Sequence, residues 1–394
     1  HVYGPHQQNV TNLHTHGLHI SPGVFAETAE QTAKEVQSDN VLLRVLPLED
    51  YYNRKTLGLG PKIKNNEVPA FARYKFHLPR PDGSPHYPGT HWYHPHPHGA
   101  TFDQVAGGMA GFLLVVGAID KFIAALYKCN AYQELPLMIQ RVLGPQPAPK
   151  EGDQGTDATY KGNKQKNRRI VALANGQILG TGCAVPTSIV QPNQVLRLRM
   201  LNGSVDGKGY LRIFIRRGES TPDLINPNQS MYQNPKFAGG KDIKNASATA
   251  KLWYTEEQHA DAIPLLNIAY DGINLMDAQG DHSAMGVEWL TLGVANRADF
   301  LISIPADVLD GEVFTIWGQE MIEAVDADGD LSPGPISGNC PKGKNCNVNL
   351  KIAQLVVNIP KDGKGKPVLL PAPDLLKNGL LDIDLKSQVM VDRI

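Results

Sequence analysis

Apolar residues recur at alternate positions, or in short unbroken runs, along most of the chain. The segments VLRLRML (195–201), YLRIFIRR (210–217) and ADFLISIP (298–305) each have the length of a single β-strand. Between such runs the chain places many of its 38 glycines and 29 prolines. Short strands punctuated by these turn-forming residues are typical of sandwiches and barrels. The pattern therefore predicts an all-β protein.

Helical periodicity is clearest in IDKFIAALYKC, residues 119–129. Four apolar residues of this segment fall at i, i+3, i+4 and i+7: Ile119, Phe122, Ile123 and Leu126. A second segment, FAETAEQTAKEVQ (25–37), combines high helix propensity with a weaker apolar stripe. It interrupts a β-like region as an insertion would. We therefore expect a short helix near 119–129 and an inserted helical segment at 25–37.

The chain has 394 residues, enough for two or three domains with a core each. We predict two tandem Greek-key β-sandwiches, residues 1–117 and 131–370, with a helical connector at 118–130. Residues 371–394 come after a stretch rich in proline, lysine and glycine. We predict that they form a linker that leads out of the second sandwich.

Charge and hydropathy exclude several classes of partner. The net charge of −1 gives no sign of a nucleic-acid or anionic-membrane partner. The basic run KGNKQKNRR (161–169) has no interleaved aromatic residues, so it predicts a solvated loop. No run of about 18 apolar residues occurs, so no membrane span is predicted. The acidic run DADGD (326–330) lacks the downstream glutamate of an EF-hand and predicts an exposed turn.

The four cysteines are dispersed, at Cys129, Cys183, Cys340 and Cys346. Cys340 and Cys346 flank a short loop, and their spacing fits either a small disulfide or two free thiols. If the protein is exported, we expect the disulfide. None of the four cysteines lies beside a histidine.

Histidines are concentrated in two short stretches. Seven of the 13 histidines lie in NLHTHGLH (12–19) and THWYHPHPHG (90–99). In a strand, His14 and His16 point to the same side with Cα atoms about 6.6 Å apart. His94 and His96 each precede a proline, which excludes the helical region and keeps both extended. Because imidazole is a ligand shared by copper, zinc, iron and nickel, these four histidines predict a metal site.

The remaining histidines are interpreted as structural. His19, His91 and His98 lie next to the predicted ligands, and we expect them to support the site without binding metal. The isolated histidines are expected to be surface or core residues: His1, His6, His77, His86, His259 and His282.

The two histidine stretches resemble the first two copper-binding motifs of the multicopper oxidases, the family that includes laccases. The more specific match is GTHWYHPHPHGATFDQVAGGMAGFLLV (89–115), in which a WYHPH core precedes a glycine-rich turn and an apolar strand. Residues 175–204, 269–275 and 292–305 resemble, more weakly, the second cupredoxin domain of the family. The resemblance implies tandem cupredoxin-like sandwiches, with copper ligands only in the first.

Carried over by position, the resemblance makes His14 a ligand of the type 2 copper in a trinuclear cluster. It makes His16, His94 and His96 ligands of the type 3 pair. Asp103, seven residues after His96, is a candidate proton donor during oxygen reduction, and a solvated carboxylate is the alternative.

The chain departs from the family pattern in its C-terminal part, where the ligands of a third domain are missing. In the family, the remaining ligands come from a third domain that includes a cysteine flanked by histidines, which binds the type 1 copper. Here the last histidine is His282, and no histidine lies near Cys346. We therefore expect a partial chain with half of the cluster ligands, an incomplete first domain and an absent third domain. Such a chain alone would be inactive.

The function implied is a laccase-like oxidase that takes single electrons from a reducing substrate and reduces dioxygen to water. The substrate stays open among phenols, bilirubin-like pigments and the ions Cu(I), Fe(II) and Mn(II). A copper-binding or assembly subunit without turnover is the alternative, and a partner chain that carries the missing ligands is another. The resemblance also implies a periplasmic or extracellular location.

Overall fold

A computed structural model describes the following residues of the chain: 10–20, 36–37, 39–76, 78, 86–127, 131–143, 170–179, 184–204, 210–222, 261–275, 285–325, 331–334 and 349–373. The chain divides into two compact units. The first contains His1–Tyr87, His91–Val115 and Arg141–Val171. The second contains Pro88–Thr90, Val116–Gln140 and Ala172–Ile394. The predicted domain boundaries at 117 and 131 stay a prediction.

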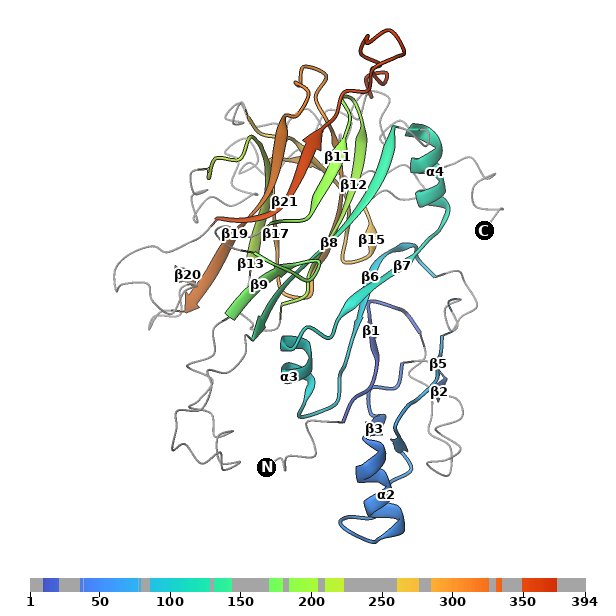
Figure 1. Cartoon of the computed structure of the whole chain (residues 1–394). Helices are drawn as coiled ribbons and strands as arrows, with labels where there is room; N and C mark the ends of the chain where they lie inside the picture. Colours follow the sequence, from blue (N-terminus) through green and yellow to red (C-terminus); the bar gives the residue numbers. More distant parts are fainter. Residues whose placement is uncertain are drawn as a thin grey trace, which may run out of the picture. The chain divides into compact units, whose positions relative to one another are not determined.

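The described part of the first unit consists of short strands and the helices α2 and α3 (Figure 1), and its strand β6 begins with two residues, Gly89 and Thr90, that belong to the second unit. Its elements are β1 (His14–His16), β2 (Val36–Gln37), β3 (Arg44–Leu46), α2 (Leu48–Thr56), β4 (Glu67–Pro69), β5 (Tyr74–Lys75), β6 (Gly89–His94), α3 (Thr101–Ala106) and β7 (Gly111–Val115). Strands β1, β6 and β7 form one sheet in that order, with β6 in the centre. Strands β2 and β5, and β3 and β4, form two smaller parallel pairs. The central strand β6 carries the first part of the second histidine motif, up to His94.

Two small apolar clusters stabilise the first unit. Leu43, Val45 and Val68 form one, and Val10, Leu46 and Tyr51 form the other. Helix α2 contributes only Tyr51 to these clusters, so it has no broad apolar stripe for sequence analysis to detect.

Most of the strands in the described part of the chain belong to the second unit. Its elements are α4 (Ala118–Tyr127), β8 (Tyr132–Leu143), β9 (Ile170–Ala174), β10 (Gln177–Ile178), β11 (Thr187–Val190), β12 (Val195–Asn202), β13 (Tyr210–Arg217), β14 (Leu265–Tyr270), β15 (Ile273–Asn274), β16 (Met285–Val287), β17 (Trp289–Leu292), β18 (Arg297–Ser303), β19 (Val313–Val325), β20 (Leu331–Gly334) and β21 (Asn349–Val357). The larger sheet has the order β10-β9-β8-β12-β18-β14-β15, with β16 paired to β14. The smaller has the order β11-β21-β19-β13-β17, with β20 paired to β19 (Figure 1).

The two sheets of the second unit enclose one apolar core. Alternate residues of β12, namely Leu196, Leu198 and Met200, belong to this core. Alternate residues of β13, among them Leu211 and Ile213, belong to it as well. The period of two is that of strands packed on one face against a second sheet. The predicted all-β fold class and the three predicted strands are thereby confirmed.

Helix α4 covers part of the outer face of the larger sheet. Its residues Ile119 and Ile123 pack with Val195, Leu266 and Leu301 in a separate cluster. The short helix predicted at 119–129 is therefore confirmed over Ala118–Tyr127.

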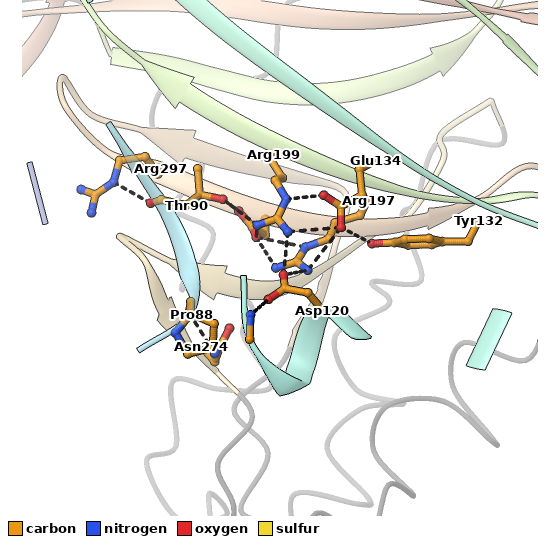
Figure 2. Close-up of polar contacts among 11 residues, drawn as sticks. Pro88, Thr90, Asp120, Tyr132, Glu134, Arg197, Arg199, Asn274 and Arg297 are labelled. Carbon is orange, nitrogen blue, oxygen red and sulfur yellow. Dashed lines mark hydrogen bonds and ion pairs between the residues drawn. The ribbon is translucent and has the colours of Figure 1, made fainter. Parts of the chain in front are cut away.

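A network of buried charges lies beside this helix (Figure 2). Asp299 accepts hydrogen bonds from Arg197 Nη2 at 2.7 Å, Arg199 Nη1 at 3.2 Å and Thr90 Oγ1 at 2.5 Å. Asp120, near the start of α4, accepts from Arg197 Nη1 and Arg199 Nη2, both at 2.6 Å. Because β12 places Arg197 and Arg199 on the face opposite the core, the two guanidinium groups meet these carboxylates under α4.

The arginines affect the acidity of their partners. Burial opposes ionisation of Asp120, but the charge of Arg197, the Gly117 N–H and Arg199 together hold the pKa of this carboxyl below its usual 3.8. Burial likewise opposes ionisation of Glu134, and hydrogen bonding to Arg199 outweighs it, so the pKa of Glu134 is also lowered. These carboxylates therefore stay charged in the folded protein at neutral pH.

The helix expected at 25–37 is wrong at its end, because Val36 and Gln37 form strand β2, which pairs in parallel with β5. The backbone pairing of a neighbouring strand prevails there over local helix propensity.

Several other predictions fall outside the described residues: residues 25–35, the basic and acidic runs, the four cysteines, the linker from 374 onward, and His1, His6, His77, His259 and His282. Among the described residues, no helix is both long enough and apolar enough to cross a membrane.

Candidate metal centre

Strand pairing brings the two histidine motifs together. β1 and β6 are antiparallel, with His14 opposite His94 and His16 opposite Trp92. Because side chains alternate along a strand, His14, His16 and His94 share one side of this sheet. The ring centroids of His14 and His94 are 5.0 Å apart, and those of His16 and His94 are 5.7 Å apart.

His96 joins the same group from the segment that follows β6. Its ring centroid lies 5.1 Å from that of His14 and 5.8 Å from that of His94. One ring nitrogen from each of His14, His16 and His94 lies within 4.8 Å of the other two. The four histidines predicted as ligands thus converge on one patch of the first unit.

Asp39 fixes the orientation of His14. Its Oδ2 atom lies 2.9 Å from His14 Nδ1 and also accepts from the main-chain N–H and the hydroxyl of Thr15. Since a carboxylate accepts, Nδ1 of His14 carries the proton and Nε2 is left with a lone pair for a metal. Sequence analysis missed Asp39, because it lies 25 residues from His14 in no recognisable motif.

His94 is the most buried member of the cluster. Its Nδ1 donates to the Pro95 carbonyl oxygen at 2.9 Å, which leaves Nε2 unprotonated in the neutral ring. Burial lowers the pKa of His94 to about 4, and the nearby His14 and His96 add to this effect. Burial also lowers the pKa of His96. Both rings are therefore neutral near pH 7, the state in which imidazole binds metals.

Trp92 forms an aromatic wall beside the cluster. Its ring stacks on His16 at a centroid distance of 5.0 Å and lies 4.3 Å from His94. Trp92 is buried, so its indole limits the rotation of both imidazoles. The tryptophan of the WYHPH core therefore packs against two of the predicted ligands.

The other histidines of the motifs lie apart from these four. His98 is exposed, with its ring 5.8 Å from that of His96. His19, His86 and His91 form a second group, in which His86 Nε2 accepts from the main-chain N–H of His19 at 2.8 Å. His86 Nδ1 donates to the Tyr87 carbonyl oxygen, so both nitrogens of His86 have main-chain partners. His86 thus links the main chain at His19 to the main chain at Tyr87.

Asp103 lies in helix α3 and is partly buried. Its main-chain oxygen accepts the N–H of Gly107 at the end of the helix. Among the described residues, no hydrogen bond or ion pair joins its carboxylate to the four histidines. Its role in supplying protons stays a prediction.

Comparison with known proteins finds similarity among solved structures. No family model matches the chain, and no curated protein matches it. The laccase-like multicopper oxidase CueO from Ochrobactrum sp. is 18% identical, covering 93% of this chain and 54% of its own, with a TM-score of 0.43. McoA from Aquifex aeolicus is 18% identical, covering 92% of this chain and 53% of its own, also with a TM-score of 0.43.

These two solved structures are multicopper oxidases. A further one, from Campylobacter jejuni, is 15% identical and covers 93% of this chain and 50% of its own, with a TM-score of 0.41. The chain spans about half the length of the solved multicopper oxidases it matches. They belong to the family that the two histidine motifs resemble.

Proposed function

We propose that the four-histidine cluster holds copper in an oxidase of the multicopper type, which takes electrons singly from a reducing substrate and reduces dioxygen to water. The observation that carries this proposal is the convergence of His14, His16 and His94, with ring nitrogens within 4.8 Å of one another. His96 lies directly beside them. The likeness of both histidine motifs to copper-binding motifs supports copper over other metals that accept imidazole.

The donor set fits this assignment. Two nitrogens bound to one ion at about 2.0 Å each lie no more than about 4 Å apart. The upper limit of 4.8 Å between the three nitrogens suits either a shared ion, after a small ring rotation, or neighbouring ions in a cluster. Nδ1 of His96 is buried and has no hydrogen-bond partner among the described residues. A metal ligand bond would satisfy this atom, which burial otherwise leaves at a cost.

The residues of this chain orient the ligands and hold their protons. Asp39 accepts the Nδ1 proton of His14, and the Pro95 carbonyl accepts that of His94, so each ring presents Nε2 to the cluster. The Thr15 hydroxyl holds Asp39 in turn. When bound, copper ions supply the electrons that dioxygen takes up.

The proposed cluster needs more ligands than these four histidines, because three copper ions with open positions require a larger donor set. In multicopper oxidases such ligands, and those of the type 1 copper, come from a further cupredoxin domain. We propose a small organic reductant or a reduced metal ion as the substrate, and a location outside the cytoplasm. Both follow from the resemblance.

Copper binding by the full chain tests the site. Cu(II) is titrated into the wild type, His94→Ala, His96→Ala and His98→Ala, and histidine nitrogen couplings are measured by electron paramagnetic resonance. We expect the wild type and His98→Ala to bind alike, because His98 is exposed and outside the cluster. His94→Ala and His96→Ala should lose the couplings of their nitrogens and bind more weakly. Wild-type copper binding by both of these variants contradicts the proposal.

Turnover separates the oxidase from a copper-binding subunit. In the protein with all of its copper sites loaded, His94→Ala should abolish dioxygen consumption and leave the blue thiolate-to-copper absorbance largely in place. Full oxidase turnover by this variant contradicts the assignment of His94. A fully loaded wild type that binds copper at the four histidines and consumes no dioxygen would instead indicate the binding subunit.

A further inference from the structure

We infer that Asn12 is a positioning residue of this centre, whose side-chain amide fixes the main chain of the ligand residue His96. The inference rests on the proposed function and extends it to a residue outside the ligand set. Asn12 lies two residues before His14, at the entry to β1, and is 7% exposed. A single side chain thus links the strand of the first histidine motif to the segment of the second.

The three hydrogen bonds that the Asn12 side-chain amide makes within the described residues all go to the main chain. Nδ2 donates to the carbonyl oxygens of Val41 at 2.8 Å and Leu43 at 3.0 Å. Oδ1 accepts the N–H of His96 at 2.6 Å. The amide therefore uses both of its donors and its acceptor, and it joins segments that are 29 to 84 residues away in the chain.

The prolines on either side of His96 make the hydrogen bond from the His96 N–H to Asn12 important for the position of this segment. β6 ends at His94, so no sheet pairing continues through residues 95–97. Pro95 and Pro97 have no N–H, which leaves His96 with the single main-chain donor of this segment. That donor is directed at Asn12. Without this acceptor, the prolines would still keep the segment extended, but nothing among the described hydrogen bonds would fix His96 against β1.

The chemistry of the position favours asparagine. Alanine would leave the half-buried N–H of His96 and the carbonyl groups of Val41 and Leu43, of which that of Leu43 is buried, without this partner. Aspartate would retain an oxygen for the His96 N–H and place a carboxylate against the carbonyl oxygens of Val41 and Leu43. These two replacements therefore separate the acceptor contact to His96 from the donor contacts to residues 41 and 43.

Asn40 provides a matched control in the same unit. It is also 7% exposed, and its Oδ1 accepts the N–H of Leu42 at 3.1 Å. Asn40→Ala thus removes a buried amide from the same neighbourhood, and the hydrogen bond described for this amide goes to the main chain of Leu42 and not to a candidate ligand. A general loss of stability would affect both alanine variants, whereas a positioning role affects Asn12→Ala alone.

Two measurements on the full chain test the inference. In the metal-free protein, hydrogen exchange of the His96 amide should be faster in Asn12→Ala than in the wild type, Asn12→Asp or Asn40→Ala. With Cu(II), Asn12→Ala should bind about 10-fold or more weakly, the usual effect of losing a group that orients a ligand, and its nitrogen couplings should change. Asn40→Ala should keep the wild-type affinity and spectrum.

Unchanged His96 exchange and unchanged Cu(II) binding in Asn12→Ala would overturn the inference, and so would equal losses in Asn40→Ala. If Asn12→Ala does not fold, slow His96 exchange in Asn12→Asp supports the acceptor contact and fast exchange refutes it. Failure of the wild type to bind Cu(II) at the four histidines would defeat the proposed function. The exchange measurement on the metal-free protein still decides the role of Asn12.

Discussion

Replacing Asp299 with asparagine should destabilise the second unit far more than the loss of an exposed carboxylate. Asp299 is 1% exposed, and it accepts hydrogen bonds from Arg197, Arg199 and Thr90. Arg197 is itself 0% exposed, so its charge has no water to compensate for a lost partner. Asparagine preserves the shape and removes the charge, which leaves two buried guanidinium groups with one carboxylate fewer.

Breaking a buried ion pair by removing one partner costs about 3–5 kcal/mol. Against a total stability of about 5–15 kcal/mol for a typical protein, this is a large fraction. Asp307 provides the control, because it pairs with Arg217 at 3.0 Å but is 77% exposed. An exposed pair is worth about 0–1 kcal/mol, so Asp307→Asn should have little effect.

The assay is urea unfolding followed by circular dichroism and tryptophan fluorescence, with the free energy and the m value fitted for each variant. We expect Asp299→Asn to lower the unfolding free energy by several times more than Asp307→Asn, at an unchanged m value. Equal losses for the two variants would show that the buried network contributes no more than a surface pair, and would refute this reasoning.

Two further predictions concern Asp120 and Gly89, which both belong to the second unit. Because the folded pKa of Asp120 lies below its usual 3.8, its stabilising contribution is present above that pH and is lost as the pH falls through the folded value. The unfolding free energy of the wild type should therefore fall more steeply below about pH 4 than that of Asp120→Asn, in acid titrations followed by circular dichroism. Gly89→Ala should cost about 1–3 kcal/mol, because its Cβ would lie 2.5 Å from the Gly272 carbonyl oxygen. Gly363→Ala, which meets no atom within 4 Å, is its control, and equal thermal unfolding of these two variants would contradict the packing argument.

The parts of the fold that sequence analysis predicted are those with a local period. Residues 195–201 and 210–217 alternate in the sequence and form β12 and β13, because each buries one face in the same core. Helix α4 was predictable because of its apolar stripe, from which Ile119 and Ile123 pack on the larger sheet. Helix α2 buries only Tyr51, so it has no apolar stripe wide enough for sequence analysis to detect.

The candidate ligands were predictable for a similar reason. His14 and His16 share a strand face by local geometry, and the prolines after His94 and His96 restrict the backbone nearby. The register between β1 and β6, which sets His14 opposite His94, is a long-range property that no local pattern contains. The sequence therefore indicated which histidines lie together, and the pairing of strands determines how they meet.

Residues that act through another residue leave no such pattern. Asp39 reaches His14 across 25 residues, and Asn12 reaches His96 across 84. Each is a single polar residue that comes into contact with its partner only when the chain has folded. The same holds for Arg197 and Arg199, which strand alternation alone would place on a solvated face. They are buried because Asp120 of α4 and Asp299 of β18 meet them there. Buried polar contacts between distant segments are thus where sequence periodicity stops being informative and where point substitutions test the structure most directly.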